Sequence, residues 1–166
     1  MIRIATLNDI PTIQQIAYHT WPSTYGEIIS EKQINYMLDL MYSTESLVQQ
    51  MAKEHQFYLF EKNQSPTQEN EVLGFASVSN ESAGVFKLNK LYIVPTAQKT
   101  GAGKELLFAV KDYALQNGGK QLILQVNKQN PAIEFYKRQG LSILSENVFE
   151  LEKGFVMDDY IMGIDL

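Results

Sequence analysis

The segment AQKTGAGKELL, residues 97–107, most constrains what this chain can fold into. It follows an apolar strand pattern that ends at Val94, and it leads into an amphipathic helix pattern over residues 101–117. The first turn of such a helix has free N–H groups and the positive end of the helix dipole. Because Gly101 and Gly103 have no side chains, an oxyanion such as a pyrophosphate can approach this backbone closely. The segment is therefore either a simple turn or a phosphate socket.

Two common glycine motifs for nucleotide binding are absent from this segment. A P-loop needs a glycine five positions before the Gly-Lys pair and Ser or Thr after it, where this chain has Gln98 and Glu105. A dinucleotide-binding fingerprint needs a glycine at the position of Leu106, which belongs to the apolar side of the helix. What remains is the spacing Q-x-x-G-x-G between a strand and a helix.

The overall charge requires any anionic ligand to be held locally. A net charge of -5 opposes the broad positive field that nucleic acids or anionic membranes require, so neither is expected as a partner. The chain has no cysteine, and its two histidines, His19 and His55, lack metal-ligand spacing, so no metal site is expected. No secretory signal or membrane span is evident, and the expected location is cytoplasmic.

The order of predicted elements describes a mixed α/β sheet with helices packed on its faces, in a single domain over residues 1–166. Seven segments read as strands: 2–6, 56–62, 72–79, 86–94, 121–126, 141–151 and 155–164. The first helix is expected to begin after Asn8 or Asp9 and to stop at Pro22. Ser30 is a candidate N-cap for the second helix. The remaining helices are expected at 46–53, at 101–117, and between 130 and 140.

Two blocks of the sequence, LYIVPTAQKTGAGKELL (residues 91–107) and NPAIEFYKRQGL (residues 130–141), lie within residues 88–141. The first resembles the strand, loop and helix unit that carries the signature [QR]-x-x-G-x-[GA] in the GNAT superfamily of acyl-CoA-dependent N-acetyltransferases. The second block is similar to the following half of that family's conserved core. The resemblance implies a mostly antiparallel mixed sheet of six to seven strands, with helices on both faces.

The resemblance implies acetyl-CoA, or coenzyme A, as the ligand of the glycine-containing loop. Main-chain groups of one strand would pair with the pantetheine amides, as an added strand would: Leu91, Tyr92 and Ile93. The loop residues would hold the diphosphate: Gln98, Lys99, Thr100, Gly101, Ala102, Gly103 and Lys104. The two lysines are either charges at the rim or simply solvated. Asn130 would approach the cofactor, or it serves only as the N-cap of its helix.

By the same resemblance, Tyr136 would protonate the leaving thiolate, although helical periodicity alone favours a buried structural tyrosine. A phenol of pKa ~10 can donate to the thiolate of a thiol with a pKa of roughly 8.5 in a dry site. Many family members have, on the strand before the loop, a carboxylate that acts as the base, but this chain has Lys87, Asn89 and Lys90 there. The remaining candidates for the base are a water chain and three acids: Glu27, Asp158 and Asp159. A strand N–H near Ile93 would stabilise the oxyanion.

Three further segments, 19–38, 56–60 and 155–162, are loosely similar to bacterial polyamine N-acetyltransferases. Aromatic Trp21 and Tyr25 beside Glu27, with the two adjacent aspartates near the C-terminus, are compatible with a small cationic amine as the acceptor. The alternative is that the two aromatic residues only pack between helices.

Without cysteine, a thiol acyl-enzyme is excluded, so direct transfer in a ternary complex is expected. Two other functions stay open: a non-catalytic acyl-CoA-binding or regulatory module, and an acetyltransferase of protein or peptide N-termini. The sequence leaves the oligomeric state open, a homodimer included.

Overall fold

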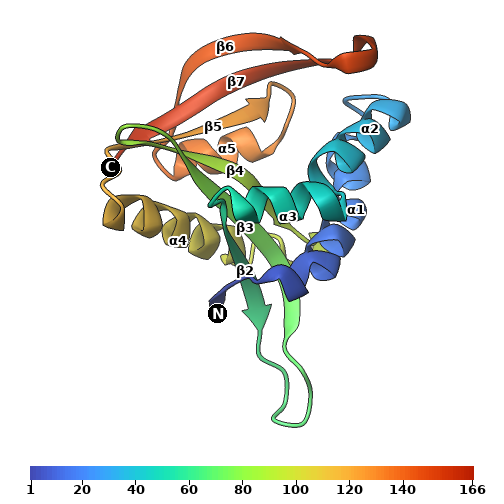
Figure 1. Cartoon of the computed structure of the whole chain (residues 1–166), viewed down its shortest axis with the longest axis vertical. Helices are drawn as coiled ribbons and strands as arrows, with labels where there is room; N and C mark the ends of the chain where they lie inside the picture. The colour runs from blue at the N-terminus through green and yellow to red at the C-terminus, as the bar shows by residue number, and fades with distance from the viewer.

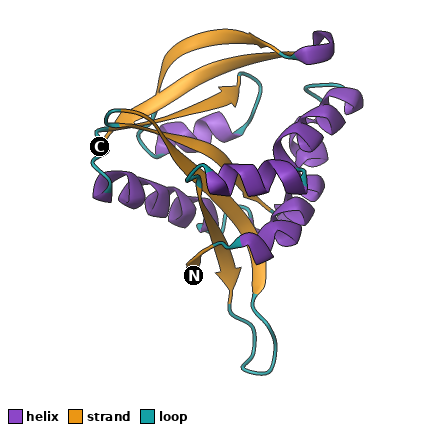
Figure 2. Ribbon diagram, in the orientation of Figure 1, coloured by secondary structure: helices purple, strands orange, loops and turns teal.

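The computed structural model describes residues 1–166 and contains a seven-stranded sheet with helices on both faces (Figures 1 and 2). In space the strands follow the order β1-β2-β3-β4-β5-β7-β6. Their bounds are β1 Ile2–Ile4, β2 Gln56–Lys62, β3 Glu71–Ser82, β4 Val85–Ile93, β5 Gln121–Asn127, β6 Ser142–Glu150 and β7 Val156–Asp165. Neighbouring strands are antiparallel except β4 and β5, which are parallel. The predicted mixed, mostly antiparallel sheet is therefore confirmed.

Different helices cover the two faces of the sheet, which we call the α1 face and the α4 face (Figure 1). The α-helices are α1 Ile10–Tyr25, α2 Glu31–Tyr42, α3 Thr44–Ala52, α4 Ala102–Gln116 and α5 Ala132–Arg138. On the α1 face, Ile13 and Leu47 are fully buried against Phe75 of β3. On the α4 face, Leu106 is fully buried with Leu122 of β5. Each such side chain stabilises the fold by about 1.5–3 kcal/mol. No helix is both long and apolar enough to cross a membrane.

Local capping signals account for where several helices begin. Ser30 caps α2 as predicted, because its Oγ accepts a hydrogen bond from the Gln33 N–H at 3.1 Å. The Gln33 side chain does not return to the cap. Its Nε2 instead donates to the Val156 carbonyl at 2.7 Å, so it ties α2 to β7. Asn130 Oδ1 accepts from the Ala132 N–H at 2.9 Å, as expected of a capping side chain, although α5 starts one residue later than predicted and Pro131 occupies its N-cap position.

The prediction that Pro22 ends the first helix is wrong, because α1 continues to Tyr25 with the proline inside it. A proline has no backbone N–H and cannot donate a hydrogen bond to the preceding turn of the helix, but its carbonyl can still accept one. The Gly26 N–H donates to the Pro22 carbonyl at 2.9 Å. Trp21 and Tyr25, on either side of the proline, are both buried on the α1 face. Their packing outweighs the local cost of the proline.

The two parallel strands in the middle of the sheet separate along their length. Residues 85–88 of β4 pair with residues 121–124 of β5, and no pairing follows beyond them. On its other side, β4 shifts register against β3, since Val78 pairs with Leu88 and Ser77 with Lys90. Asn89 is therefore an extra residue, and such a bulge bends its strand. The result is a gap between the second half of β4 and β5, beside the start of α4.

Candidate active site

The loop between β4 and α4 presents a run of free backbone N–H groups. None of the N–H groups from Lys99 to Lys104 donates to an acceptor within the protein. The first bond into the helix comes from the Glu105 N–H, which donates to the Gly101 carbonyl at 3.0 Å. Gly101 has a φ of 92° and precedes α4, a conformation that costs a residue with a Cβ about 1 kcal/mol. Consecutive N–H groups at a helix N-terminus make an anion-binding concavity.

Side chains around this loop leave the concavity open. Thr100 Oγ1 turns inward and donates to the Ala97 carbonyl at 2.5 Å. Lys99 and Lys104 are exposed, and neither forms an ion pair with a carboxylate. Both cations are therefore free to meet an anion at the rim. The predicted set of loop residues lies together at one place on the surface.

Gly103 brings the two sequence blocks around the loop and α5 into contact. A Cβ built on Gly103 would lie 3.4 Å from Cζ of Phe135 in α5, so the start of α4 packs directly against that ring. Phe135 and Tyr136 are adjacent, with ring centroids 5.4 Å apart. The helix that carries the predicted acid therefore contacts the end of the loop, and the role of Tyr136 stays a prediction.

The register of β4 directs specific main-chain groups into the gap beside β5. The Val94 N–H donates to the Leu73 carbonyl of β3 at 2.9 Å. Because polar groups alternate along an antiparallel pair, those of Tyr92 also face β3, while those of Leu91 and Ile93 face the gap. Gln98 Nε2 donates to the Ile93 carbonyl at 3.3 Å, which agrees with this alternation.

Tyr136 is buried in α5, with 7% of its surface exposed, and its hydroxyl has no hydrogen-bond partner in the protein. Burial, and secondly the neighbouring Tyr25, raise the pKa of the Tyr136 phenol above its ordinary value. The group therefore keeps its proton at neutral pH. A buried phenol without a partner, beside the loop, can donate a hydrogen bond to a bound ligand.

Tyr25 connects α1 to both β4 and α5. Its hydroxyl lies 3.1 Å from the Tyr92 hydroxyl, and it accepts from Asn130 Nδ2 at 3.3 Å. Trp21 stacks on Tyr25 with ring centroids 4.6 Å apart, and it is 2% exposed. The packing role considered for both aromatic residues is therefore present. Their contact with an acceptor stays a prediction.

The three candidate acids lie in different environments. Glu27 is exposed in the turn between α1 and α2. Asp158 is also exposed, and its carboxylate forms an ion pair with Lys128 at 2.9 Å. Asp159 is 2% exposed, and its Oδ2 accepts from Gln125 Nε2 at 2.7 Å. Its Oδ1 is buried without a donor. Burial, as the largest cause, raises the pKa of the Asp159 carboxyl above its ordinary value.

A cavity of about 340 Å³ opens among the α1–α2 turn, the loop after β5 and the first residues of β7. Its lining residues are Ile28, Ile29, Ser30, Gln33, Asn127, Lys128, Gln129, Val156 and Asp158. Its lining includes Asp158, and Ile28 of the lining follows the predicted acceptor residue Glu27 in the chain. Gln125 binds Asp159, and Gln33 binds β7. Neither role could be identified from the sequence, because the partners are more than 30 residues away.

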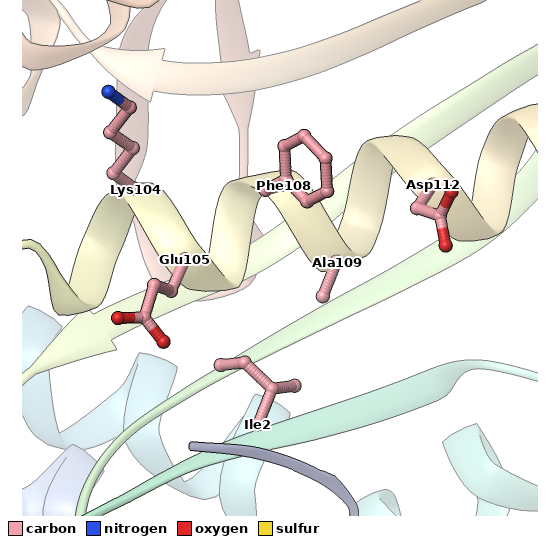
Figure 3. A pocket seen from close by; sticks show the side chains of 6 residues that line it. All are labelled: Ile2, Lys104, Glu105, Phe108, Ala109 and Asp112. Atoms are coloured by element: carbon pink, nitrogen blue, oxygen red, sulfur yellow. The ribbon is translucent and has the colours of Figure 1, made fainter.

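A second cavity, of about 440 Å³, lies along the outer side of α4 (Figure 3). Glu105 and Ala109 point toward Ile2 of β1, while Phe108 stands away from it and is 73% exposed. Only Lys104 among the predicted site residues lines this cavity. It is therefore separate from the place where the loop, the gap and Tyr136 meet.

Comparison with known families identifies most of the chain. The model of the family described as "Acetyltransferase (GNAT) domain" matches residues 27–159. An uncharacterized N-acetyltransferase, YuaI of Bacillus subtilis (strain 168), is 30% identical over 155 residues, which cover 90% of this chain and 84% of that protein. A second uncharacterized N-acetyltransferase of the same organism, YhfO, is 43% identical over 82 residues, which are about half of each chain.

Two relatives from Thermoplasma acidophilum add a substrate name and a solved fold. A spermidine N(1)-acetyltransferase is 26% identical over 143 residues, covering 86% of this chain and 88% of that protein. The crystal structure of the PaiA N-acetyltransferase in complex with coenzyme A superposes with a TM-score of 0.77 at 23% identity. That match covers 100% of this chain and 98% of the other. The likeness establishes a shared fold.

Proposed function

The chain belongs to the GNAT acetyltransferase family, and from this premise we propose that it moves the acetyl group of acetyl-CoA to the primary amine of a small cationic acceptor such as a polyamine. The proposal rests above all on one observation. Six consecutive unpartnered N–H groups, from Lys99 to Lys104, lead into α4, whose first turn packs against α5, and α5 carries the buried Tyr136 with its free hydroxyl. This arrangement would hold an anionic group at one end and place a proton donor at the other.

The main chain supplies most of the proposed cofactor binding. The free N–H groups of the loop would hold the diphosphate, with Lys99 and Lys104 adding charge at its rim. The main-chain groups of Leu91 and Ile93 that face the gap would pair with the pantetheine amides, because an extended ligand can complete an open strand edge. The coenzyme A complex of the PaiA enzyme is consistent with this ligand.

Tyr136 is proposed as the general acid. The acceptor nitrogen forms its bond to the acetyl carbon, the carbon–sulfur bond breaks, and Tyr136 gives its proton to the leaving sulfur. Burial raises the pKa of the Tyr136 phenol, and it also raises the pKa of a thiol in the same pocket. The ordinary gap between pKa ~10 and roughly 8.5 then costs about 2 kcal/mol, which is small beside a typical barrier. The N–H of Ile93 is the donor proposed for the oxyanion.

The overall charge of the chain supports a cationic acceptor. The chain carries a net charge of -5, although Asp158 in the cavity of about 340 Å³ is paired with Lys128 of the same lining. Such a field raises the local concentration of polyamine cations. The spermidine N(1)-acetyltransferase of Thermoplasma acidophilum is a relative with such a substrate.

Thiol release from acetyl-CoA, measured across polyamines, amino sugars, amino acids and peptide N-termini, tests this function. We expect polyamines to give the highest kcat/KM. Tyr136→Phe should lower kcat by about 100-fold or more, the usual contribution of a positioned acid, while coenzyme A affinity stays within about twofold. Tyr113→Phe is the matched control, because this half-buried hydroxyl of α4 makes no hydrogen bond.

Other results would favour the alternative functions. Binding of coenzyme A without amine-stimulated thiol release, in every acceptor class, would identify a non-catalytic binding module. A preference for peptides over free diamines would identify an acetyltransferase of peptide N-termini. Unchanged turnover in Tyr136→Phe would remove this residue from the role of acid.

A further inference from the structure

Along the end of β5, the side chains on the α1 face are polar, whereas those on the α4 face are apolar. On β5, Leu122, Leu124 and Val126 are buried on the α4 face. The alternate residues of the strand point to the other side, and there Gln125 reaches across to Asp159 of β7. A carboxylate and an amide thus lie on the α1 face of the sheet, beside the part of β5 that follows its last pairing with β4 at Leu124.

The Asp159 carboxylate is held on one oxygen and unsatisfied on the other. Gln125 Nε2 donates to Oδ2 at 2.7 Å, which fixes the plane of the group. Oδ1 is buried and has no donor in the protein. A buried carboxylate charge costs free energy when one oxygen has no donor. An N–H, an ammonium group or a water beside Oδ1 would remove this cost.

Asp159 lies on the side of the sheet where the proposed reaction takes place. Burial is the largest cause that raises the pKa of Tyr25, and the negative charge of Asp159 adds to the rise. Tyr25 is in turn bound to Asn130 at the start of α5 and is close enough to influence Tyr136. Asn127, which pairs with Asp159 across the β5–β7 ladder, lines the cavity of about 340 Å³.

The other acids near this cavity are less suited to take a proton from an acceptor. Asp158 points to the opposite side of β7, and Lys128 already neutralises it at 2.9 Å. Glu27 is exposed, with no partner that fixes its carboxylate. The charge of Lys87 lowers the pKa of Asp159, but Lys87 itself pairs with Glu81 at 3.8 Å. Lys90, the buried cation of β4, donates to Gln50 at 2.6 Å.

We propose that Asp159 is the general base of the acetyl transfer and the anchor for the acceptor's ammonium group. The inference rests on the proposed function. Oδ1 takes one proton from the ammonium, directly or through one water, and leaves a neutral amine with a free lone pair. The amine attacks the thioester carbonyl, the carbon–sulfur bond breaks, and Tyr136 gives its proton to the sulfur. The second proton lost by the nitrogen restores the Tyr136 phenol. Asp159 then releases its proton to solvent, so that ammonium and acetyl-CoA give the amide, coenzyme A and one proton.

The test compares Asp159→Asn with Asp112→Asn, an equal change of charge at an exposed position of α4 outside the proposed site. With a polyamine at pH 7, Asp159→Asn should lower kcat/KM by about 100-fold or more, as loss of a positioned base does. Asp112→Asn should stay within about threefold, since one exposed charge contributes little. Coenzyme A affinity should be unchanged in both variants.

The pH profile separates a base from a structural role. The wild-type kcat/KM should fall at acidic pH as Asp159 becomes protonated, and Asp159→Asn should lack this limb. Its activity should instead rise roughly tenfold per pH unit between about pH 7 and 9, because the fraction of free amine rises in that way for an amine of pKa ~10. An aromatic amine that is already neutral at pH 7 should lose much less activity in this variant.

Failure of the inference is distinguishable from failure of the proposed function. Wild-type protein without thiol release from any amine overturns the function itself. Active wild type, together with an Asp159→Asn variant that matches it from pH 6 to 9, overturns only the role of Asp159. If Asp159→Asn does not fold, Gln125→Met decides, because it removes the hydrogen bond that lowers the pKa of Asp159. The acidic limb should move to higher pH, and an unmoved limb overturns the inference.

Discussion

The hydroxyl oxygens of Tyr25 in α1 and Tyr92 in β4 lie 3.1 Å apart, although 67 positions separate the residues in the chain. Asn130 Nδ2 completes the group by donating to Tyr25 at 3.3 Å. Burial raises the pKa of both phenols, so both remain neutral at physiological pH. This small network joins the first helix, the strand beside the gap and the start of the helix that carries Tyr136.

Tyr25→Phe should destabilise the protein and slow turnover. The change leaves Asn130 without its acceptor and Tyr92 without its partner inside the protein, which costs about 1–3 kcal/mol for a buried polar group. Urea unfolding measures the free energy, and kcat with acetyl-CoA in excess measures turnover. Tyr36→Phe is the control, because that hydroxyl makes no hydrogen bond and its ring packs on Phe155. Equal stability of the two variants would contradict the role of the network.

Gly101→Ala should weaken cofactor binding, whereas Gly118→Ala should not. The two glycines flank α4 with φ values of 92° and 82°, and a Cβ at either position would meet no atom within 4 Å. Each variant therefore carries a similar backbone strain of about 1 kcal/mol. Only Gly101 lies within the run of free N–H groups, so its new methyl group hinders the approach of a phosphate. Calorimetry should give an affinity for coenzyme A about tenfold lower, or about 1.4 kcal/mol.

If both glycine variants bind coenzyme A as tightly as the wild type, the diphosphate binds elsewhere. If both lose affinity by the same factor, strain in α4, and not contact with the ligand, controls binding. The unfolding free energies of the two variants provide the internal check, because they should agree with each other.

Local chemistry explains the features of the fold that the sequence predicts. The cap at Ser30 and the turn that contains Gly101 depend on a few adjacent residues. The alternation of apolar side chains over residues 56–62 is typical of a strand, and β2 has these same bounds. The contact between Gly103 and Phe135 joins two blocks that only the family resemblance, and not local chemistry, had linked.

Features that depend on distant contacts could not be predicted in this way. Pro22 reads as a helix stop because its local cost is visible in the sequence, whereas the burial of Trp21 and Tyr25 around it is not. The donor to Asp159 comes from Gln125, 34 positions earlier, and only the pairing of β5 with β7 brings them together. Sequence alone therefore left Asp159 equivalent to its neighbour Asp158, although one is buried and the other exposed.

Lys90 gives a prediction about stability that is independent of catalysis. Its ammonium is buried on the α1 face, donates to Gln50 Oε1 at 2.6 Å and lies 5.4 Å from the centre of the Tyr42 ring. Burial lowers the pKa of Lys90 to about 8, from an ordinary value near 10.5. In the unfolded chain the pKa of this lysine stays near 10.5, so the side chain remains protonated up to a higher pH. Between these two values the unfolded state binds more protons, so stability must rise with pH.

The expected rise is about 3 kcal/mol in total if the whole shift is expressed, at 1.36 kcal/mol per pH unit. Urea unfolding from pH 7 to 9.5 should therefore show increasing stability in the wild type and a flatter profile in Lys90→Met. This variant fills a similar volume without a buried charge, and at pH 7 it should be at least as stable as the wild type. The series should end below pH 10, because the unfolded state then begins to ionise tyrosines that burial keeps neutral in the fold. Parallel profiles for the two proteins would mean that Lys90 keeps an ordinary pKa inside the fold.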